Sequence, residues 1–295
     1  PISDALNNFD KYSTDKTIMT LAGRIMARRE HGGSMFVDLR DQHDKIQGFI
    51  KEDIIGNDEF SRFSELVDTG DFVEISGTLF KTKKEEKTLE IKGFRMLSKA
   101  LLPLPEKWHG IQDEEEKLRK RYLDLIMNPG ERELFIKKAK FWQAVRQFLL
   151  KEGGLEVETP VLEKIPGGAD AEPFATHMNA LDIDLYLRIS LELNLKRLLV
   201  AGYEKVFEIG RIFRNEGIDR EHLQDYTQME MYLAFTDYNQ LMDIIKRLIQ
   251  ETVQTVTGGF SHEYMGQHIN WEGNWEKYDY FDEFKKYTNI NLADI

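Results

Sequence analysis

The chain has 295 residues, of which 41% are hydrophobic and 11% aromatic, so it is long enough to form two domains with cores of ordinary size. It contains no Cys, and this excludes disulfides, thiolate zinc sites and cysteine nucleophiles. Its net charge of −12 argues against indiscriminate binding of phosphate, although it leaves room for a specific nucleic-acid partner.

The first third of the chain alternates short β-rich runs with turn residues. An amphipathic run at Glu59–Val67 predicts a helix after the third of these runs. Five strands with a helix in that position are the layout of an oligonucleotide/oligosaccharide-binding (OB) barrel, whose open face binds single strands, although other small barrels share the pattern. The predicted strands are Ile18–Arg28, Ser34–Arg40, Ile46–Lys51, Phe72–Lys81 and Thr88–Leu97.

A Pro-punctuated segment, Leu101–Pro105, precedes the highly charged stretch Gln112–Arg121, and the sequence predicts a domain boundary there. We expect a first domain at 1–105, a linker at 106–130 and a second domain at 131–295. Residues 1–105 hold 16 Lys and Arg against 18 Asp and Glu, so the first domain carries little of the negative charge. Charges interrupt every apolar stretch, which predicts neither a membrane span nor a secretory signal and favours a cytoplasmic location.

Helical periodicity begins at Glu131 and ends at Gly153-Gly154. Two strands are predicted next, Leu155–Val161 and Ile183–Ile189, and then a helix with Ser190 as its N-cap and Gly202 at its end. A long antiparallel hairpin and a further helix complete the domain. The hairpin has strands Lys205–Asn215 and Tyr226–Phe235 joined by an irregular connection at Glu216–Asp225, and the helix covers Tyr238–Val256.

Side chains on a strand alternate between its two faces, so residue parity in the hairpin predicts which side chains lie together. One face is polar and is formed by Glu208, Arg214 and Glu216 on the first strand with Tyr226, Gln228, Glu230 and Tyr232 on the second. Met229, Met231 and Leu233 lie behind and are expected to face a core. The polar face indicates either a polar site or cross-strand ion pairs on a solvated surface, and parity leaves both open.

The run FEIGRIFRNEGIDREHLQDYTQMEMYLAF resembles the second signature motif of class II aminoacyl-tRNA synthetases, and its details are similar to the lysyl-type members. VRQFLLKEGGLEVETP resembles the first signature motif, which forms the homodimer interface of this family. LSKALLPLPEKWHGIQDEEEKLRKRYLDL, IPGGADAEPFATHMNALDIDLYLRI and LELNLKRLLVAGYEKVFEIGRIFRNEG continue the lysyl-type pattern, so the resemblance covers essentially the whole chain. It implies an α+β fold, with a five-stranded OB barrel followed by an antiparallel sheet with helices.

The resemblance implies an ATP site in the second domain. Arg214, the implied catalytic residue, contacts the α-phosphate and the lysine carboxylate, while Glu216 reads the adenine edge and His222 touches the terminal phosphate. Tyr226 stands where the family usually has Phe, and its ring retains an aromatic face for the adenine. Without the resemblance, His222 would be an ordinary loop residue. The implied ATP-binding residues are Arg214, Asn215, Glu216, His222, Leu223 and Tyr226.

The resemblance also implies a site for L-lysine. Gly168 and Glu192 match positions that hold the α-amino group, Glu230 and Tyr232 match those that hold the side-chain ammonium, and Arg214 contacts the carboxylate. A desolvated ammonium requires carboxylates and a hydroxyl. An aspartyl- or asparaginyl-type relative is the alternative, and an aspartate-activating one would require a cation there. Residue types alone also allow Gly167-Gly168 to be a turn and Glu192 a favourable first-turn acid of a helix.

In the barrel, Arg29, Phe36 and Gln47 match family positions that contact the anticodon, which implies tRNA(Lys) as a partner. An aromatic side chain can stack an unpaired base. Met35 and Val37 have the opposite parity to Phe36, so the sequence leaves open whether Phe36 faces the barrel core or a base.

The expected reaction uses ATP and Mg²⁺ to activate L-lysine and transfers it to tRNA. Residues 258–295 resemble only the approach to the third signature motif, so the acidic metal ligands and the ATP-binding Arg of that region are expected downstream, with no metal ligand within this chain. We therefore expect an incomplete catalytic domain that dimerises in part but does not make lysyl-adenylate by itself. Two further alternatives are a catalytically silent protein that binds tRNA or a partner, and a protein-modifying paralogue, against which the barrel counts.

Overall fold

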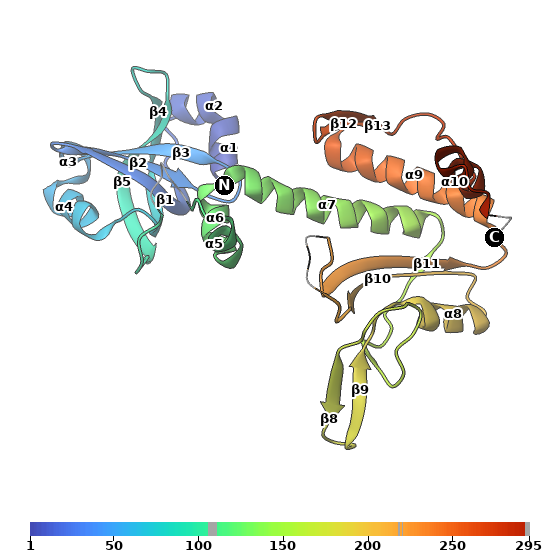
Figure 1. Ribbon diagram of the computed structural model, residues 1–295. Coiled ribbons are helices and arrows are strands. Elements are labelled where there is room, and N and C mark those ends of the chain that lie inside the picture. Colours follow the sequence, from blue (N-terminus) through green and yellow to red (C-terminus); the bar gives the residue numbers. More distant parts are fainter. Residues whose placement is uncertain (106–110, 218, 220, 293–295) are drawn as a thin grey trace. The chain divides into compact units, whose positions relative to one another are not determined.

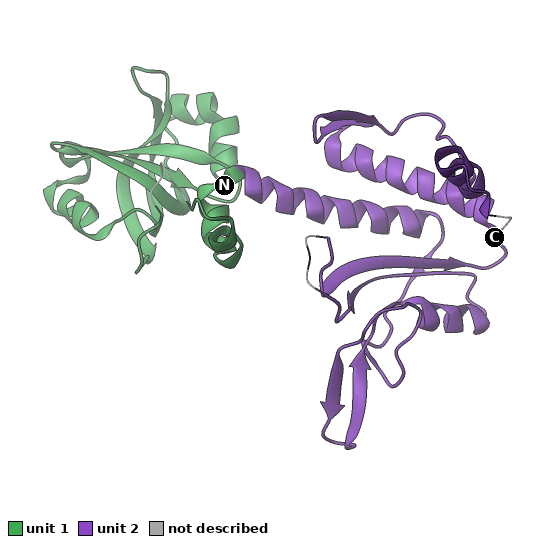
Figure 2. Ribbon diagram, viewed as in Figure 1, with its two compact units in different colours: residues 1–129 green, residues 130–295 purple. Residues whose placement is uncertain are grey.

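The computed structural model describes residues 1–295 except 106–110, 218, 220 and 293–295. The chain divides into two compact units, Pro1–Pro129 and Gly130–Ile295 (Figure 2), and each is described by itself.

The first unit contains a closed five-stranded barrel with the strand order β1-β2-β3-β5-β4. Strand β3 pairs with β5 in parallel, and the other neighbouring strands that pair are antiparallel. All five predicted strands form, so the expectation of an OB barrel is confirmed. They are β1 (Met19–His31), β2 (Ser34–Arg40), β3 (Lys45–Lys51), β4 (Phe72–Lys81) and β5 (Lys87–Ser98).

Short helices surround this barrel. The predicted helix at Glu59–Val67 is α4 (Asn57–Leu66), and it follows α3 (Glu52–Ile55) between β3 and β4. Two N-terminal helices that the sequence analysis did not predict, α1 (Ile2–Asn7) and α2 (Phe9–Thr14), bury apolar residues in the same core as the strands. The charged stretch after the barrel forms α5 (Glu114–Arg119) and α6 (Arg121–Met127), which belong to the first unit.

The barrel core is built by alternation along the strands. In β4, Val73, Ile75 and Leu79 are buried between more exposed neighbours. Gly77 is buried as well. A Cβ at this position would lie 1.8 Å from the carbonyl oxygen of Glu90 on β5. The strands approach too closely there for any side chain, and the register between β4 and β5 shifts between Ser76 and Gly77.

The second unit is built on a sheet with the order β11-β10-β6. Helices α7 and α9 lie on one side of the β10–β11 hairpin and α8 lies on the other (Figure 1). The helices are α7 (Pro129–Lys151), α8 (Glu192–Val200) and α9 (Tyr238–Thr257), and the strands are β6 (Leu155–Glu156), β10 (Lys205–Phe213) and β11 (Asp225–Leu233).

Smaller elements complete the second unit. A three-stranded sheet has the order β7-β9-β8, and a separate hairpin joins β12 to β13. The sequence analysis predicted neither this hairpin nor the last helix, α10. The elements are β7 (Leu162–Glu163), β8 (Ala175–Met178), β9 (Ile183–Leu187), β12 (Ser261–Tyr264), β13 (Gln267–Asn270) and α10 (Tyr280–Thr288).

Three predicted boundaries in this unit were wrong. The predicted strand Leu155–Val161 ends at Glu156, because the Thr159 amide donates to the Glu208 carboxylate and Pro160 has no N–H. The strand predicted over Ile183–Ile189 ends at Leu187, because the next amide, that of Arg188, bonds to the carbonyl of Val161 outside the β8–β9 ladder.

The helix expected to be capped by Ser190 begins at Glu192 instead, with Leu191 at the N-cap position. The Ser190 hydroxyl still accepts a hydrogen bond from the Glu192 amide at 3.0 Å. Ser190 therefore satisfies the first helical amide although it lies one residue before the N-cap.

Within the part of the chain that the structure describes, no helix combines the length and apolar character that a membrane crossing requires.

Candidate active site

The two faces of the β10–β11 hairpin have different environments, as residue parity predicted. Odd-numbered residues pack against α7 and α9, and Met229 and Met231 are among them. Even-numbered residues face α8, where Val206, Ile212, Tyr226 and Tyr232 surround two buried leucines of that helix and its N-cap. The face that was expected to be polar therefore also contributes apolar side chains to a hydrophobic core with α8. The α8 leucines are Leu191 and Leu195.

Glu208 lies on this even face but does not line an open site. Its carboxylate is 4% exposed and accepts hydrogen bonds from the Arg188 guanidinium at 2.6 Å and the Thr159 hydroxyl at 2.7 Å. Arg188 is 3% exposed and also donates to the carbonyls of Thr159 and Arg211. The sequence left open whether Glu208 lines a polar site or forms an ion pair on a solvated face; this carboxylate instead lies in a buried ion pair and joins three segments of the chain.

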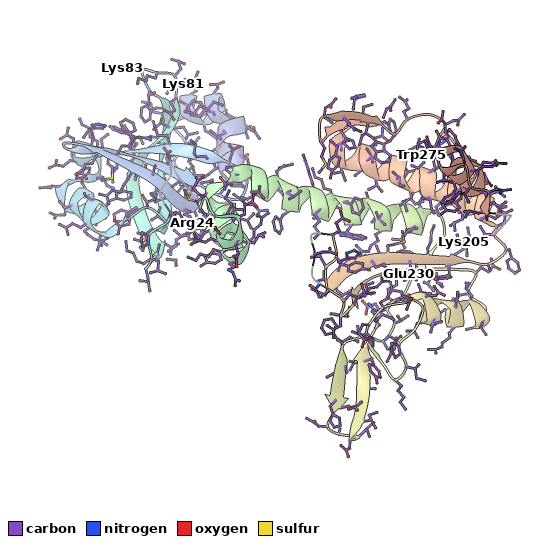
Figure 3. The ribbon with its side chains drawn as sticks, in the orientation of Figure 1. Arg24, Lys81, Lys83, Lys205, Glu230 and Trp275 are labelled. Atoms are coloured by element: carbon purple, nitrogen blue, oxygen red, sulfur yellow. The ribbon has the colours of Figure 1, made fainter. Side chains whose placement is uncertain are left out.

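Glu230, which Figure 3 labels on β11, is held by a dense set of donors. Its Oε1 atom accepts from the Ser190 hydroxyl at 3.0 Å, the Leu191 amide at 3.1 Å and the Gln228 side-chain amide at 2.8 Å. Its Oε2 atom accepts from the Tyr232 hydroxyl at 3.2 Å. The loop before α8 and one face of β11 thus converge on a single carboxylate.

A second carboxylate, that of Glu192, lies beside the same hydroxyl. The hydrogen bond from the Lys196 ammonium, at 2.6 Å, lowers the pKa of the Glu192 carboxyl. Burial, followed by the charges of Glu230 and Glu192, raises the pKa of the Tyr232 hydroxyl, which therefore remains a hydrogen-bond donor at neutral pH. The Lys196 ammonium lies 5.8 Å from the centre of the Tyr232 ring, so this cluster already accommodates one primary ammonium.

Gly168 closes the cluster from the loop that precedes β8. Its φ of +85° lies in the left-handed region, where glycine is unstrained. A Cβ at this position would lie 2.9 Å from both the Glu192 Cβ and the Ser190 Oγ. A side chain at residue 168 would therefore displace the groups around the two carboxylates. The structure thus brings together four of the predicted lysine-binding residues, namely Gly168, Glu192, Glu230 and Tyr232.

Arg214 lies just beyond the end of β10. Its amide donates to the Gln224 carbonyl at 2.8 Å, and its guanidinium Nε donates to the Ile189 carbonyl at 3.3 Å, next to Ser190. The guanidinium carbon is 5.9 Å from the centre of the Tyr226 ring. One positive charge and one aromatic face therefore stand beside the carboxylate cluster, on the same face of the hairpin.

The remaining predicted ATP residues lie in the connection between β10 and β11, and their side chains are exposed. Within the described part of this connection, the His222 imidazole bonds to the Asp219 carboxylate at 2.6 Å, and this contact raises the pKa of His222. Glu216 was expected on the strand, but β10 ends at Phe213. The described hydrogen bonds of these residues lead away from the carboxylate cluster: the Asn215 amide donates to the Glu172 carbonyl at 2.7 Å, and His222 bonds to Asp219.

Over the described residues, no group of three or more His, Asp or Glu side chains is arranged to hold a metal ion.

In the barrel, β2 resolves the orientation that parity left open. Met35 and Val37 are fully buried, so Phe36 points to the outer face of the barrel. Its ring lies 4.7 Å from that of Phe49, which in turn lies 6.1 Å from that of Phe80. We call Phe36, Phe49 and Phe80 the aromatic strip; it crosses β2, β3 and β4 on one surface.

The other two predicted anticodon residues lie along this strip. Arg29 on β1 is the cross-strand partner of Phe36, and its guanidinium donates to the Asp38 carboxylate at 3.1 Å. Gln47 is 8% exposed. Its side-chain amide donates to the Glu86 carboxylate at 3.1 Å, and its side-chain oxygen accepts from the Thr88 hydroxyl at 2.9 Å. The structure therefore brings Arg29, Phe36 and Gln47 to one face of the barrel.

The sequence analysis assigned no site role to two residues of the carboxylate cluster. Ser190 was interpreted only as a helix cap, and Gln228 only as a member of the polar face, yet both donate to Glu230. Position is the signal that could have identified them: Ser190 is two residues before Glu192, and Gln228 is two residues before Glu230.

Comparison with known proteins agrees with this geometry. Residues 113–295 match the family described as tRNA synthetases class II (D, K and N), and residues 19–97 match the OB-fold nucleic acid binding domain. The chain is 44% identical over 293 residues to the lysine–tRNA ligase of Thermoanaerobacter sp. (strain X514), covering 99% of this chain and 58% of that protein.

Two further relatives are similar. The lysine–tRNA ligase of Clostridium novyi (strain NT) is 46% identical over 277 residues, covering 94% of this chain and 54% of that protein. The lysine–tRNA ligase of Carboxydothermus hydrogenoformans is 44% identical over 292 residues, covering 99% of this chain and 59% of that protein. The chain spans somewhat more than half the length of these relatives. A class II catalytic region following an OB barrel thus accounts for nearly the whole sequence, and the chain belongs to the class II tRNA synthetase family that covers D, K and N.

Proposed function

We propose that this chain carries the lysine-binding, ATP-binding and anticodon-binding parts of a lysine–tRNA ligase. The observation that carries the proposal is the cluster of Glu192, Glu230 and Tyr232 closed by Gly168, which offers two carboxylates and a hydroxyl to a primary ammonium. The 44–46% identity to lysine–tRNA ligases supports the same substrate.

In the first step of the proposed reaction, a carboxylate oxygen of L-lysine attacks the α-phosphorus of ATP. A bond forms between that oxygen and phosphorus, the bond from the α-phosphorus to the bridging oxygen breaks, and pyrophosphate leaves. Arg214 offers positive charge to the α-phosphate and the lysine carboxylate, while the Tyr226 ring offers a stacking face to adenine. Mg²⁺ enters the proposal as the counter-ion of the triphosphate.

In the second step, a terminal ribose hydroxyl of tRNA(Lys) attacks the lysyl carbonyl, and AMP leaves. The chemistry requires no protein nucleophile, so the work of the chain is positioning and charge neutralisation. The aromatic strip with Arg29 and Gln47 is the proposed contact for the anticodon. The substrates ATP and tRNA place the proposed reaction in the cytoplasm.

An aspartyl- or asparaginyl-type activity is the second candidate, because the matching family covers D, K and N. The carboxylate cluster argues against aspartyl-type activity, since the side-chain carboxylate of aspartate would meet like charge there. A silent tRNA- or partner-binding protein is the third, and binding of L-lysine in the calorimetric titration below would separate a ligase's substrate site from it.

The proposal is tested with Glu230→Gln, measured by calorimetric titration of L-lysine, L-aspartate and ATP. We expect L-lysine to bind and L-aspartate not to bind. The substitution should weaken lysine binding by about 2 kcal/mol, roughly thirtyfold, because one charge-assisted hydrogen bond is lost.

ATP binding should not change in Glu230→Gln, and Glu272→Gln, at an exposed glutamate, should change neither ligand. Preferential binding of L-aspartate, or equal losses for lysine and ATP, would contradict the proposal.

A further inference from the structure

The two oxygens of the Glu230 carboxylate are unequally occupied. Three donors converge on Oε1, from Ser190, Leu191 and Gln228, whereas among the described residues one donor, the Tyr232 hydroxyl, reaches Oε2. A carboxylate has about four lone-pair sites shared between its two oxygens, so Oε1 is saturated and Oε2 keeps acceptor capacity.

The two side chains that saturate Oε1 are fixed in their roles. Ser190 is 4% exposed, and its oxygen already accepts the Glu192 amide, so its single proton is committed to Glu230. The Gln228 amide donates to Glu230 at 2.8 Å, while its own oxygen is buried and has no hydrogen-bond partner in the described part of the chain. A buried acceptor without a partner is unfavourable, so packing alone gives no reason for an amide at residue 228, where an apolar side chain would avoid the cost.

Ligand cations differ in how many carboxylate oxygens they use. A planar guanidinium pairs best in a fork, with two parallel N–H donors on two oxygens, whereas a primary ammonium is a compact point donor that needs only one. With Oε1 occupied, Glu230 can offer one oxygen, and the Tyr232 hydroxyl oxygen lies beside it.

We propose that Ser190 and Gln228 are specificity-determining positioning residues, which occupy one oxygen of Glu230 so that the pocket accepts a primary ammonium and rejects a guanidinium. This inference rests on the proposed function, since it takes L-lysine as the ligand at Glu230. It adds the reason why an amino acid with a guanidinium side chain, such as L-arginine, is excluded although its charge is the same.

The test compares binding of L-lysine and L-arginine by calorimetric titration in the unaltered protein, Ser190→Ala, Gln228→Met and the double variant. Each single substitution removes one of the three donors on Oε1 and leaves two, whereas the double variant leaves only the Leu191 amide and so opens one acceptor position. We expect the lysine-to-arginine affinity ratio to fall by about tenfold in the double variant and by less in each single one, because one additional charge-assisted hydrogen bond becomes available to the guanidinium.

Gln254→Met is the matched control, because this glutamine is exposed on α9, and it should leave the ratio unchanged. ATP affinity and the melting temperature show whether a variant has lost its fold, and Ser190→Ala, which removes a single oxygen atom, provides the comparison if Gln228→Met unfolds. An unchanged ratio in variants that still bind lysine would overturn this inference alone. No lysine binding by the unaltered protein would overturn the proposed function and this inference with it.

Discussion

At the scale of single residues, Glu208 and Glu230 are direct cross-strand partners on β10 and β11. Like charges in this position destabilise a sheet unless each has its own partners. Glu208 is paired with the buried Arg188 guanidinium, and Glu230 accepts four hydrogen bonds from uncharged donors. The first carboxylate is therefore neutralised internally, while the second retains its charge for a ligand.

Removing the negative charge of the buried Arg188–Glu208 pair should destabilise the fold. Glu208→Gln leaves the Arg188 guanidinium buried without its counter-charge, and we expect the second unit to lose about 3–5 kcal/mol of unfolding free energy. Urea unfolding measures the loss. Glu204→Gln, at an exposed position beside the start of β10, should change stability by less than about 0.5 kcal/mol. A loss that small for Glu208→Gln as well would show that the pair does not hold these segments together.

His222 makes a prediction about pH. The Asp219 carboxylate, which accepts a hydrogen bond from the imidazole, raises the pKa of His222 above the ordinary value of 6.5. A raised pKa keeps the positive charge to higher pH, so the ion pair is fully formed below pH 6.5 and is lost as the pH rises through the raised value. An NMR titration of His222 should have its midpoint above 6.5 and move down toward 6.5 in Asp219→Asn. A midpoint that Asp219→Asn leaves in place would contradict this pairing.

At the scale of elements, the two domains present their chemistry on different surfaces of a sheet. The hairpin places its candidate site on the face that α8 covers, so the carboxylates are partly buried and their hydrogen bonds are strong. The barrel instead places the aromatic strip on its outer surface, because Met35 and Val37 fill the interior from the alternate positions of β2. Burial suits a small cation that must be desolvated, and an outer surface suits unpaired bases.

Phe36→Ala tests the barrel surface. Loss of one stacking ring should weaken binding of a tRNA(Lys) anticodon stem-loop by about 1–3 kcal/mol, whereas lysine binding should not change. Fluorescence anisotropy measures the affinity, and circular dichroism checks that the barrel is folded. Phe36→Tyr retains the ring and should bind like the unaltered protein. Equal affinities for Phe36→Ala and Phe36→Tyr would rule out stacking at this residue.

At the scale of the whole molecule, α7 indicates how two copies could associate. One side of this helix is buried under the hairpin, through Val145, Phe148 and Leu149. On the opposite side of α7, apolar residues remain exposed in the single chain, with Ile136 at 43% and Leu150 at 44%. Exposed apolar residues along one helix are typical of a protein–protein interface, and the homodimer proposed from the first signature motif would cover them.

Ile136→Glu should disrupt this proposed dimer, because it places a charge where an apolar contact is expected. We expect the dimer dissociation constant, measured by sedimentation velocity, to rise at least about tenfold. Gln254→Glu adds the same charge to an exposed position of α9, away from the exposed side of α7, and serves as the control. If the two variants dimerise equally well, the interface does not involve Ile136.

By itself, the sequence determined the features that follow from local periodicity and from long matching runs. The five barrel strands, the three long helices of the second unit and the hairpin faces could be predicted because alternation and helical spacing are properties of neighbouring residues. Boundaries such as Glu156 and Leu187 could not, because backbone amides there bond to partners far along the chain.

Only the tertiary structure decided which carboxylate is paired with a buried cation and which is held by uncharged donors alone. Glu208 and Glu230 have the same parity and the same chemistry, but Arg188, distant from both in sequence, lies against one of them. The roles of Ser190 and Gln228 emerged for the same reason, because their importance depends on where the Glu230 oxygens lie in space. A pattern reports which face a side chain occupies, whereas its hydrogen-bond partners are set when separate segments pack together.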